Sequence, residues 1–412
     1  MIYTLSGPQH IDTTIQLPPS KSISNRALII QALANGNLVP RHLSDCDDTK
    51  VIVEALKTRS ETIDIKAAGT AMRFLTAYLS VRKGEHVLTG TDRMKQRPIG
   101  VLVDALRYLG ADIQYEGEVG YPPLRIKGRP LTGGFIEIPG NVSSQFISAL
   151  LLIGPMLEKG LELKQTDEII SRPYIDLTLC MMRDFGAIAD WTDVDTIRVA
   201  AKAYSARDYY IESDWTASSY WYEIMALADD SEAVVRLEGL MDGSKQGDSV
   251  VKYIFSLLGI KTSFETTAPG VPNIVTLHRH KCLLPRLEYD FTGSPDLAQT
   301  VVVTCVNMNI KFHFKGLSTL RIKETDRIEA LKTELRKLGF VLQSVGDDEL
   351  LWDGERCQPS DEPIETYEDH RMALAFAPVA LKRQGLQINN PEVVSKSYPD
   401  YWKDLQTAGF TL

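Results

Sequence analysis

Cysteine is scarce in this sequence, which has five cysteines among 412 residues. They are far apart without any Cys-x-x-Cys pair, which argues against zinc or dithiol chemistry, and an odd number is not typical of a disulfide framework. No run of 18 apolar residues occurs, so we expect no membrane-spanning helix. The first residues lack the basic and apolar regions of a signal peptide. These absences favour a protein of the reducing cytoplasm.

Positive charge is also in deficit. Lys and Arg total 45 against 54 Asp and Glu, a net charge of −9. The field of such a protein repels nucleic acid and anionic membranes, so we expect neither as a partner. Apolar residues make up 44% and charged residues 24%, a globular composition that disfavours disorder. Any anionic ligand must therefore meet a local cluster of basic side chains.

A repeated helix ending runs through the chain. Five segments of helical periodicity stop at an apolar residue or alanine followed by a glycine, namely Gly110, Gly186, Gly259, Gly339 and Gly409. Glycine just past a helix adopts the left-handed conformation that ends it. The intervals between these glycines are 76, 73, 80 and 70 residues. Such regular spacing predicts a modular fold.

Each of these helices follows an earlier apolar helix, and one more pair of helices lies between Ser22 and Arg59. The six earlier helices start near Ser22, Thr70, Ser144, Ala217, Asp296 and His370. Strand-like stretches such as 136–138 and 312–314 alternate with the helices, which predicts an α/β (α+β) fold of six units. Only 48 residues separate the first two starts, against 73 to 79 later, so about one hairpin is missing from the first unit. We expect a division into three plus three units near Ser213.

The segment 17–28 places serines and a lysine at the start of a helix. Free backbone N–H groups, the helix dipole and the Lys21 ammonium there favour an anion. Ser22 and Arg26 are four residues apart and share a face of the helix. An ordinary capped helix also explains a lone Ser-Lys-Ser, and it is the favoured interpretation of this motif alone. A Walker P-loop is excluded because its glycines are missing.

Two further helix starts have the same character. Gly69 would let a ligand approach the backbone, and Thr70 is a candidate N-cap. Ser143, Ser144 and Gln145 open another apolar helix. Ordinary capping remains the alternative for both. The motifs gain weight only from their recurrence.

The pentad 323–327 is expected to begin the helix that ends before Gly339. Lys323 and Arg327 would then share one face, with Glu324 turned by about a hundred degrees. Nearby cations favour the ionised form of a carboxylate, so a catalytic acid here would need burial or a second anion. The alternative is a salt-bridged surface helix.

Basic side chains recur at or near helix starts in this acidic protein: Lys21, Arg26, Arg97, Lys323, Arg327, Arg371 and Lys396. We expect the residues 395–400 to form a loop before the last helix, and His370 alone indicates only a structural residue. Opposite charges 4 Å apart attract by about 4 kcal/mol when the effective dielectric constant is about 20. A small polyanion would therefore offset the repulsion among gathered cations. The pattern predicts phosphorylated and carboxylated substrates.

In their order along the chain these motifs closely resemble those of the 5-enolpyruvylshikimate-3-phosphate synthase family, also called 3-phosphoshikimate 1-carboxyvinyltransferases. The matching motifs are residues 21–26, 68–73, 97–100, 143–146, 172–176, 323–327 and 369–372. The resemblance implies two globular domains, each of three βαβαββ-like units around a pseudo-threefold axis, with a ligand cleft between them. The first domain would comprise residues 1–20 and 214–412, and the second residues 21–213.

The resemblance also implies the reaction. The 5-hydroxyl of shikimate 3-phosphate attacks C2 of phosphoenolpyruvate while C3 is protonated, and the tetrahedral intermediate then expels phosphate. This step belongs to the shikimate pathway, which leads to chorismate and the aromatic amino acids. The family implies no metal and no organic cofactor, and we expect a cytoplasmic monomer.

The matching positions imply roles for particular residues. Asp296 would be the base near the hydroxyl, and Glu324 with Lys21 would handle protons at the enolpyruvyl carbon and the leaving phosphate. Shikimate 3-phosphate would be bound by Lys21, Ser22, Arg26, Ser143, Ser144, Gln145, Ser171, Tyr174, Asp296 and Lys323. Phosphoenolpyruvate would be bound by Lys21, Gly69, Arg97, Gln145, Arg327, Arg371 and Lys396.

The sequence departs from the family pattern at several places, three of which bear on the expected ligand contacts. Ala67 stands where the family usually has Asn, Phe74 where it usually has Pro, and Thr319 where it often has Asn. The first two flank the expected phosphoenolpyruvate pocket. At Thr319 the expected contact with the substrate phosphate is shorter or lost.

Two other functions remain as alternatives. A binding homologue that has lost turnover would keep the cations, but Asp296 and Glu324 argue against it because carboxylates weaken the binding of polyanions. A UDP-N-acetylglucosamine enolpyruvyl transferase shares the fold and the donor. It typically has Lys-Asn and a reactive loop cysteine, whereas this chain has Lys21-Ser22 and no cysteine in residues 90–97.

Overall fold

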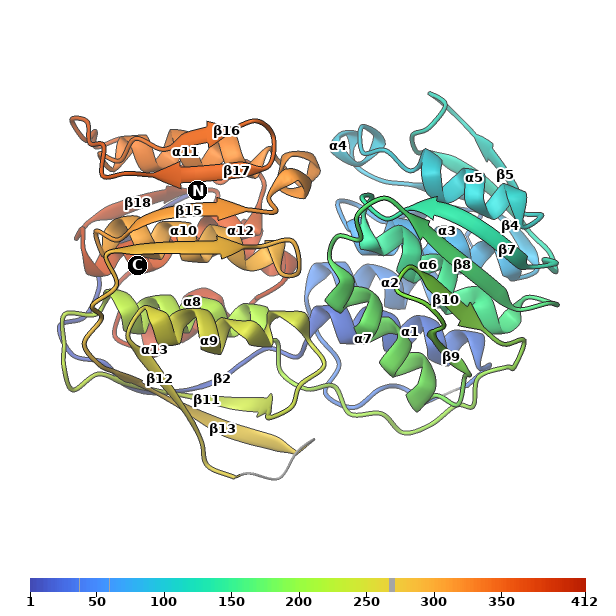
Figure 1. The fold of residues 1–412 in the computed structure, drawn as a ribbon, viewed down its shortest axis with the longest axis horizontal. Coiled ribbons are helices and arrows are strands. Elements are labelled where there is room, and N and C mark those ends of the chain that lie inside the picture. The colour runs from blue at the N-terminus through green and yellow to red at the C-terminus, as the bar shows by residue number, and fades with distance from the viewer. Residues whose placement is uncertain (37, 59, 267–270) are drawn as a thin grey trace. The chain divides into compact units, whose positions relative to one another are not determined.

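The computed structural model describes residues 1–36, 38–58, 60–266 and 271–412, and its contacts divide the chain into two compact units (Figure 1). Unit 1 comprises Met1–Pro19 and Glu212–Leu412, and unit 2 comprises Ser20–Ile211. The chain therefore passes between the units twice, once before and once after unit 2 in the sequence. No helix of the described residues is long and apolar enough to cross a membrane.

Unit 2 consists of a pair of helices followed in sequence by two complete repeats. Its elements are α1 (Lys21–Leu33), α2 (Asp47–Lys57), β3 (Thr62–Asp64), α3 (Gly69–Val81), β4 (Gly84–Thr89), α4 (Asp92–Lys95), α5 (Gly100–Tyr108), β5 (Asp112–Tyr115), β6 (Leu124–Gly128), β7 (Gly134–Pro139), α6 (Ser144–Ile153), η1 (Gly154–Met156), β8 (Leu161–Thr166), α7 (Arg172–Asp184), β9 (Ala189–Trp191) and β10 (Thr196–Val199).

Unit 1 begins with two strands from the N-terminal segment and continues after unit 2. Its elements are β1 (Ile2–Leu5), β2 (Asp12–Gln16), α8 (Trp215–Leu227), β11 (Val234–Met241), η2 (Gly247–Val250), α9 (Val251–Leu257), β12 (Ile260–Phe264), β13 (Pro272–Arg279), β14 (Arg286–Asp290), η3 (Pro295–Leu297), α10 (Ala298–Asn307), β15 (Lys311–Lys315), η4 (Ser318–Ile322), α11 (Arg327–Lys337), β16 (Gln343–Val345), β17 (Glu349–Trp352), α12 (His370–Phe376), η5 (Ala377–Leu381), β18 (Leu386–Asn389), η6 (Pro391–Lys396) and α13 (Tyr401–Thr407).

Four sheets share one topology. Their strand orders are β3-β4-β6-β5, β7-β8-β10-β9, β2-β11-β13-β12 and β14-β15-β17-β16. In each sheet the first two strands are parallel and a hairpin adds two antiparallel strands. In three of these sheets a helix follows the first strand and another follows the second, so the repeat is βαβαββ. The sheet that begins with β2 has the same order, except that the whole of unit 2 lies between β2 and α8. This confirms the modular α/β fold.

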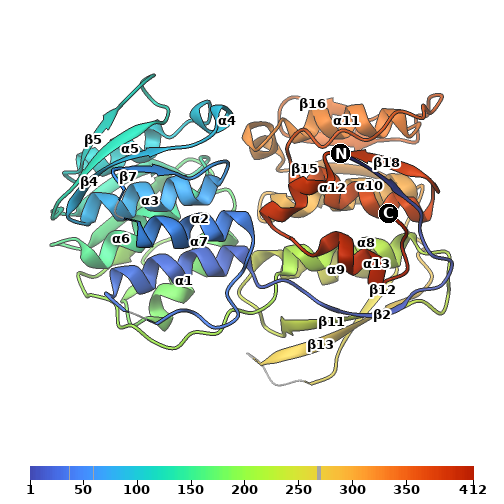
Figure 2. The ribbon, with the colours of Figure 1, turned by 180° about the vertical axis from the view of Figure 1, so that it is seen from behind.

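The first and last repeats are reduced. The described residues of 21–58 form α1 and α2 and no strand, so more than the predicted hairpin is missing there. The last repeat pairs α12 and α13 with the two-stranded sheet β1-β18, in which Tyr3 lies opposite Ile388. Figure 2 shows both helix pairs from behind. The sequence did not predict this second reduction, because β18 pairs with β1 from the opposite end of the chain.

Buried helices form the centre of each unit. In unit 1, α8 packs against α10 and is buried along its length, with Trp215 and Trp221 fully enclosed. In unit 2, α3 packs against α6, which is buried from Phe146 to Ile153 and is apolar there except for Ser148. A helix that is apolar on all sides needs neighbours all round. Other helices supply them for α6, and helices together with strands β11 and β13 supply them for α8, so the polar starts of these helices are held in fixed positions.

The predicted glycine stops are confirmed. All five glycines have positive φ angles, 105° at Gly110, 85° at Gly186, 88° at Gly259, 93° at Gly339 and 93° at Gly409. This conformation is available to glycine at little cost and ends the helix before a strand. The five cysteines are free thiols.

Candidate active site

In unit 1 the polar cluster begins with a helix start that differs from the prediction. Helix α11 begins at Arg327, because the Asp326 carboxylate accepts hydrogen bonds from Ile328 N and Glu329 N, each at 3.1 Å. Lys323 and Glu324 therefore precede the helix, and the expected shared helical face is wrong. The physical reason is that an aspartate at the N-cap satisfies free N–H groups, which fixes the first turn after it.

Arg327 joins three carboxylates in the interior of unit 1. Its side chain is 2% exposed. Nε lies 2.7 Å from Asp369 Oδ2, Nη1 lies 3.3 Å from Asp296 Oδ1, and Nη2 lies 3.0 Å from Glu324 Oε2. Burial lowers the pKa of Arg327, but the charges of Asp369, Glu324 and Asp296 outweigh it, so the net direction is upward. The guanidinium stays charged and fixes the carboxylates around it.

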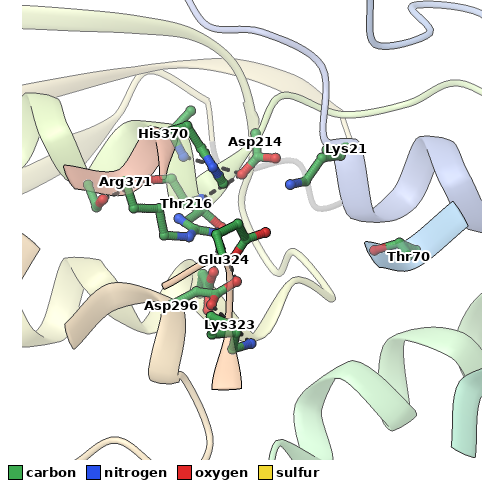
Figure 3. Close-up of polar contacts among 12 residues, drawn as sticks. Lys21, Thr70, Asp214, Thr216, Asp296, Lys323, Glu324, His370 and Arg371 are labelled. Carbon is green, nitrogen blue, oxygen red and sulfur yellow. Dashed lines mark hydrogen bonds and ion pairs between the residues drawn. The ribbon is translucent and has the colours of Figure 1, made fainter. Parts of the chain in front are cut away.

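Asp296 lies on η3 among three cations. Arg371 Nη2 is 2.8 Å from Asp296 Oδ2, and Lys323 Nζ is 3.6 Å from Oδ1, the oxygen that Arg327 also contacts (Figure 3). Burial lowers the pKa of Lys323, although the charge of Asp296 opposes this. The structure thus brings together four residues that the sequence predicted for the site.

Glu324 lies between two cations, Arg327 as expected and Lys396 where Lys323 was expected. Its Oε1 is 2.8 Å from Lys396 Nζ, and its Oε2 contacts Arg327. Lys396 ends η6 and is not in an open loop, so the predicted loop begins later than expected. Both carboxylates predicted for proton transfer therefore contact the same arginine.

Asp369 and Tyr220 complete the cluster and were not predicted. Asp369 is 0% exposed and caps α12, since its Oδ1 accepts a hydrogen bond from Arg371 N at 2.9 Å. Tyr220 OH lies 3.3 Å from Arg371 Nη1, and burial raises the pKa of Tyr220 to about 12 against the effect of that cation. An aspartate directly before an apolar helix was the available signal for Asp369.

In unit 2, α1 begins at Lys21 after the N-cap Ser20. Lys21 Nζ lies 3.3 Å from Asp48 Oδ2 at the start of α2. Arg26 is 4% exposed, and burial lowers its pKa to about 10. Its hydrogen bonds go to uncharged oxygens at 2.7–3.3 Å, those of Ser22 O, Tyr174 O, Ser148 Oγ and Thr178 Oγ1. Arg26 thus brings Ser22 and Tyr174 together.

A second group in unit 2 surrounds the start of α3. This helix begins at Gly69 with Ala68 as N-cap, so the prediction of Thr70 as N-cap is wrong. The Thr70 hydroxyl accepts a hydrogen bond from Gln145 Nε2 at 3.1 Å instead. A Cβ on Gly69 would lie 2.8 Å from Arg97 Nη1, so glycine allows that guanidinium to approach the backbone.

The starts of α6 and α7 carry the remaining predicted residues of unit 2. Ser143 is the N-cap of α6 and accepts a hydrogen bond from Gln145 N at 3.4 Å, while Ser144 is the first residue of the helix. Ser171 precedes α7 in the left-handed region, with a φ of 55°, and Tyr174 lies in the first turn. Helix packing thus fixes each of these polar groups.

Two of the departures from the family pattern are buried. Phe74 is 1% exposed and lies under Arg26, whose guanidinium carbon is 5.4 Å from the ring centroid. Thr319 Oγ1 is buried and has no hydrogen-bond partner among the described residues. Ala67 is exposed. The same described residues contain no group of three or more His, Cys, Asp and Glu placed to hold a metal ion.

The fold belongs to the enolpyruvyl transferase class. It is similar to the 2.37 Å structure of EPSP synthase from Acinetobacter baumannii, with a TM-score of 0.78 at 21% identity, covering 100% of this chain and 99% of that one. It is also similar to the enolpyruvyl transferase NikO from Streptomyces tendae, with a TM-score of 0.73 at 17% identity, covering 99% and 98% of the two chains.

Sequence comparison narrows the class to one family. The family model for EPSP synthase (3-phosphoshikimate 1-carboxyvinyltransferase) matches residues 5–63 and 57–405, and the chain belongs to this family. A 3-phosphoshikimate 1-carboxyvinyltransferase of Bacteroides fragilis is 56% identical over 411 residues, covering 100% of this chain and 98% of the relative. One of Aliivibrio fischeri is 36% identical over 431 residues, covering 98% of each chain.

Proposed function

We propose that this chain transfers the enolpyruvyl group of phosphoenolpyruvate to the 5-hydroxyl of shikimate 3-phosphate and releases phosphate. The observation that carries the proposal is the contact of Arg327 with both Asp296 and Glu324 in a member of this family. One buried arginine holds two partly accessible carboxylates, so two proton-transfer groups are fixed near each other. The product would enter chorismate and aromatic amino acid biosynthesis.

The reaction needs a base and an acid in its first step. Asp296 takes the proton of the attacking 5-hydroxyl, and Glu324 or Lys21 delivers a proton to C3 of phosphoenolpyruvate. In the second step the residue that protonated C3, Glu324 or Lys21, takes a proton back from C3 while the C2–O bond to phosphate breaks and the phosphate departs with the bonding electrons. Positioned groups of this kind contribute about 10²- to 10⁴-fold in rate. No step requires a metal or an organic cofactor.

The cations stabilise the anionic groups of both substrates through charge-assisted hydrogen bonds. Shikimate 3-phosphate is bound by Lys21, Ser22, Arg26, Ser143, Ser144, Gln145, Ser171, Tyr174, Asp296 and Lys323. Phosphoenolpyruvate is bound by Lys21, Gly69, Arg97, Gln145, Arg327, Arg371 and Lys396. These sets include residues of both units, so we propose that units 1 and 2 are the two domains of the enzyme and that both are needed for turnover.

The test is phosphate release by the purified, metal-stripped protein given both substrates, with each omitted in turn. Asp296→Ala and Glu324→Gln should each lower kcat by about 10²- to 10⁴-fold. Glu329→Gln is the matched control, because Glu329 lies on α11 with its side chain 50% exposed. Saturable binding of shikimate 3-phosphate without any phosphate release would make this protein an anion-binding homologue.

We also propose that the protein acts as a cytoplasmic monomer. Light scattering of the purified protein during size-exclusion chromatography should give the mass of one chain, with or without both substrates. A mass of two chains at the concentrations used for the activity measurement would contradict the monomer.

A further inference from the structure

Asp369 makes contacts that exceed those of a helix cap. Its Oδ2 lies 2.7 Å from Arg327 Nε and its Oδ1 lies 3.3 Å from Arg327 Nη2, so the pair is bidentate. The same Oδ1 accepts a hydrogen bond from Arg371 N and lies 3.6 Å from His370 Nδ1. Asp369 is 0% exposed. A carboxylate buried to this extent is stable only with a well-placed cation and further hydrogen bonds.

A second capping aspartate in the same unit provides the comparison. Asp326 accepts hydrogen bonds from two backbone N–H groups of α11, and its other oxygen contacts Arg321 at 3.1 Å. Its side chain is 36% exposed. Asp326 is therefore an ordinary N-cap of the helix that begins with Arg327. Asp369 caps only one N–H group of α12 with its side chain and accepts two hydrogen bonds from Arg327.

The contacts of Asp369 orient the guanidinium group of Arg327. The group is planar, so a carboxylate that holds the edge formed by Nε and Nη2 fixes the directions of all its N–H groups. Arg327 then presents Nη1 to Asp296 and Nη2 to Glu324. The cap on α12 meanwhile fixes the start of the helix from which Arg371 reaches Asp296.

We propose that Asp369 is a positioning residue for the enolpyruvyl transfer, which it serves by holding Arg327 and the first turn of α12 so that Arg327 and Arg371 meet Asp296 and Glu324. It contacts neither substrate and moves no proton. This inference rests on the proposed function for its kinetic consequence, whereas the anchoring of Arg327 can be measured without turnover.

The kinetic test compares Asp369→Asn with Asp326→Asn. The asparagine in place of Asp369 still caps α12 but turns an N–H donor toward Arg327, so the bidentate pair is lost. We expect kcat to fall about a hundredfold, the loss that a displacement of about 1 Å can cause, with a raised KM for phosphoenolpyruvate. Asp326→Asn should change both constants by less than about threefold, within the scatter of surface cap changes.

The pH profile separates positioning from loss of stability. Without the charge of Asp369, the positive charge of Arg327 acts more strongly on Asp296 and Glu324 and favours their ionised forms. Lys323 and Arg371 face Asp296, and Lys396 faces Glu324, in both proteins. Both limbs of the kcat profile of Asp369→Asn should therefore shift to lower pH. An unshifted profile with wild-type kcat would overturn the proposal.

An NMR measurement decides the anchoring directly. In protein labelled with ¹⁵N-arginine, the Nε–H of Arg327 should exchange slowly with water, and Arg327→Lys identifies its signal. Exchange should accelerate at least tenfold in Asp369→Asn and not in Asp326→Asn. Should the asparagine variant not fold, Asp369→Ser replaces it, since serine is an equally good N-cap without a carboxylate. Unchanged exchange overturns the proposal, even in a protein that releases no phosphate.

Discussion

Two of the buried arginines, Arg327 in unit 1 and Arg26 in unit 2, have opposite surroundings. Arg327 contacts three carboxylates, which raise its pKa despite burial. Arg26 contacts hydroxyl and carbonyl oxygens, and burial lowers its pKa to about 10. Both guanidinium groups have hydrogen-bond partners, but among the described residues carboxylates contact Arg327 and none contacts Arg26.

The difference indicates a division of labour. Carboxylates around Arg327 provide groups that can exchange protons, and the arginine keeps them in place. Neutral partners around Arg26 leave positive charge in unit 2, where an anion would gain most from binding. We infer that unit 1 chiefly supplies the proton chemistry and unit 2 chiefly supplies the binding of anionic groups.

The largest test of this comparison replaces each arginine by lysine. In Arg327→Lys a compact ammonium cannot reach all three carboxylates, and Asp369 remains buried without its bidentate partner. The free energy of unfolding of unit 1 should fall by about 3–5 kcal/mol. In Arg26→Lys the partners left behind are neutral, so unit 2 should lose only about 1–3 kcal/mol.

Hydrogen exchange read by mass spectrometry measures both units in the same sample. Peptides from α11 and α12 report on unit 1, and peptides from α1 and α7 report on unit 2. Equal losses of protection in the two variants would mean that the carboxylates around Arg327 add nothing, and the comparison would be wrong.

The second test concerns a buried carboxyl group outside the Arg327 cluster. Glu212 is 6% exposed, and burial raises its pKa from 4.5 to about 7, although the hydroxyl of Ser244 donates a hydrogen bond to it at 2.6 Å. Between those pH values the unfolded chain has released this proton while the folded chain retains it. Stability should therefore fall by about 3 kcal/mol as the pH rises from 4.5 to 7 and stay level above.

Glu212→Gln removes this titration and should flatten that part of the curve. Urea unfolding between pH 4.5 and 8, followed by hydrogen exchange in α8, gives the measurement, with Glu329→Gln as the exposed control. A variant that keeps the full slope would assign it to other groups, such as Glu223, whose pKa burial also raises. The lack of a nearby arginine would then not distinguish Glu212 from the carboxylates around Arg327.

The repeats could be predicted from sequence because their signals are local. Helical periodicity and a glycine stop lie within about twenty residues, and all five stops are confirmed. The partner of β2 could not be predicted in this way. Ile15 of β2 lies opposite Leu237 of β11, with the whole of unit 2 between them in sequence. Pairing at that distance depends on the packing of the complete unit.

In the site, residue types were easier to predict than their positions. The pentad 323–327 was expected to begin the helix that ends before Gly339, whereas Asp326 caps a helix that starts at Arg327. The spacing of Asp326 and Glu329 resembles a capping box and was the signal that could have corrected this. Ser148 and Thr178 gave no signal, because a hydroxyl inside an apolar helix is ordinary until an arginine from another helix, here Arg26, contacts it.

The smallest test examines how closely unit 2 places a cation against its backbone. In Gly69→Ala the new Cβ would lie 2.8 Å from Arg97 Nη1, and the flexible end of that side chain must move. Gly100→Ala is the matched control, since Gly100 also begins a helix and its Cβ would meet Gly120 Cα at 3.4 Å. We expect KM for phosphoenolpyruvate to rise about tenfold in the first variant, equivalent to about 1.4 kcal/mol, with kcat nearly unchanged. A lower kcat at unchanged KM would place Arg97 in the chemistry instead of in binding, and the division of labour between the two units would fail at this residue.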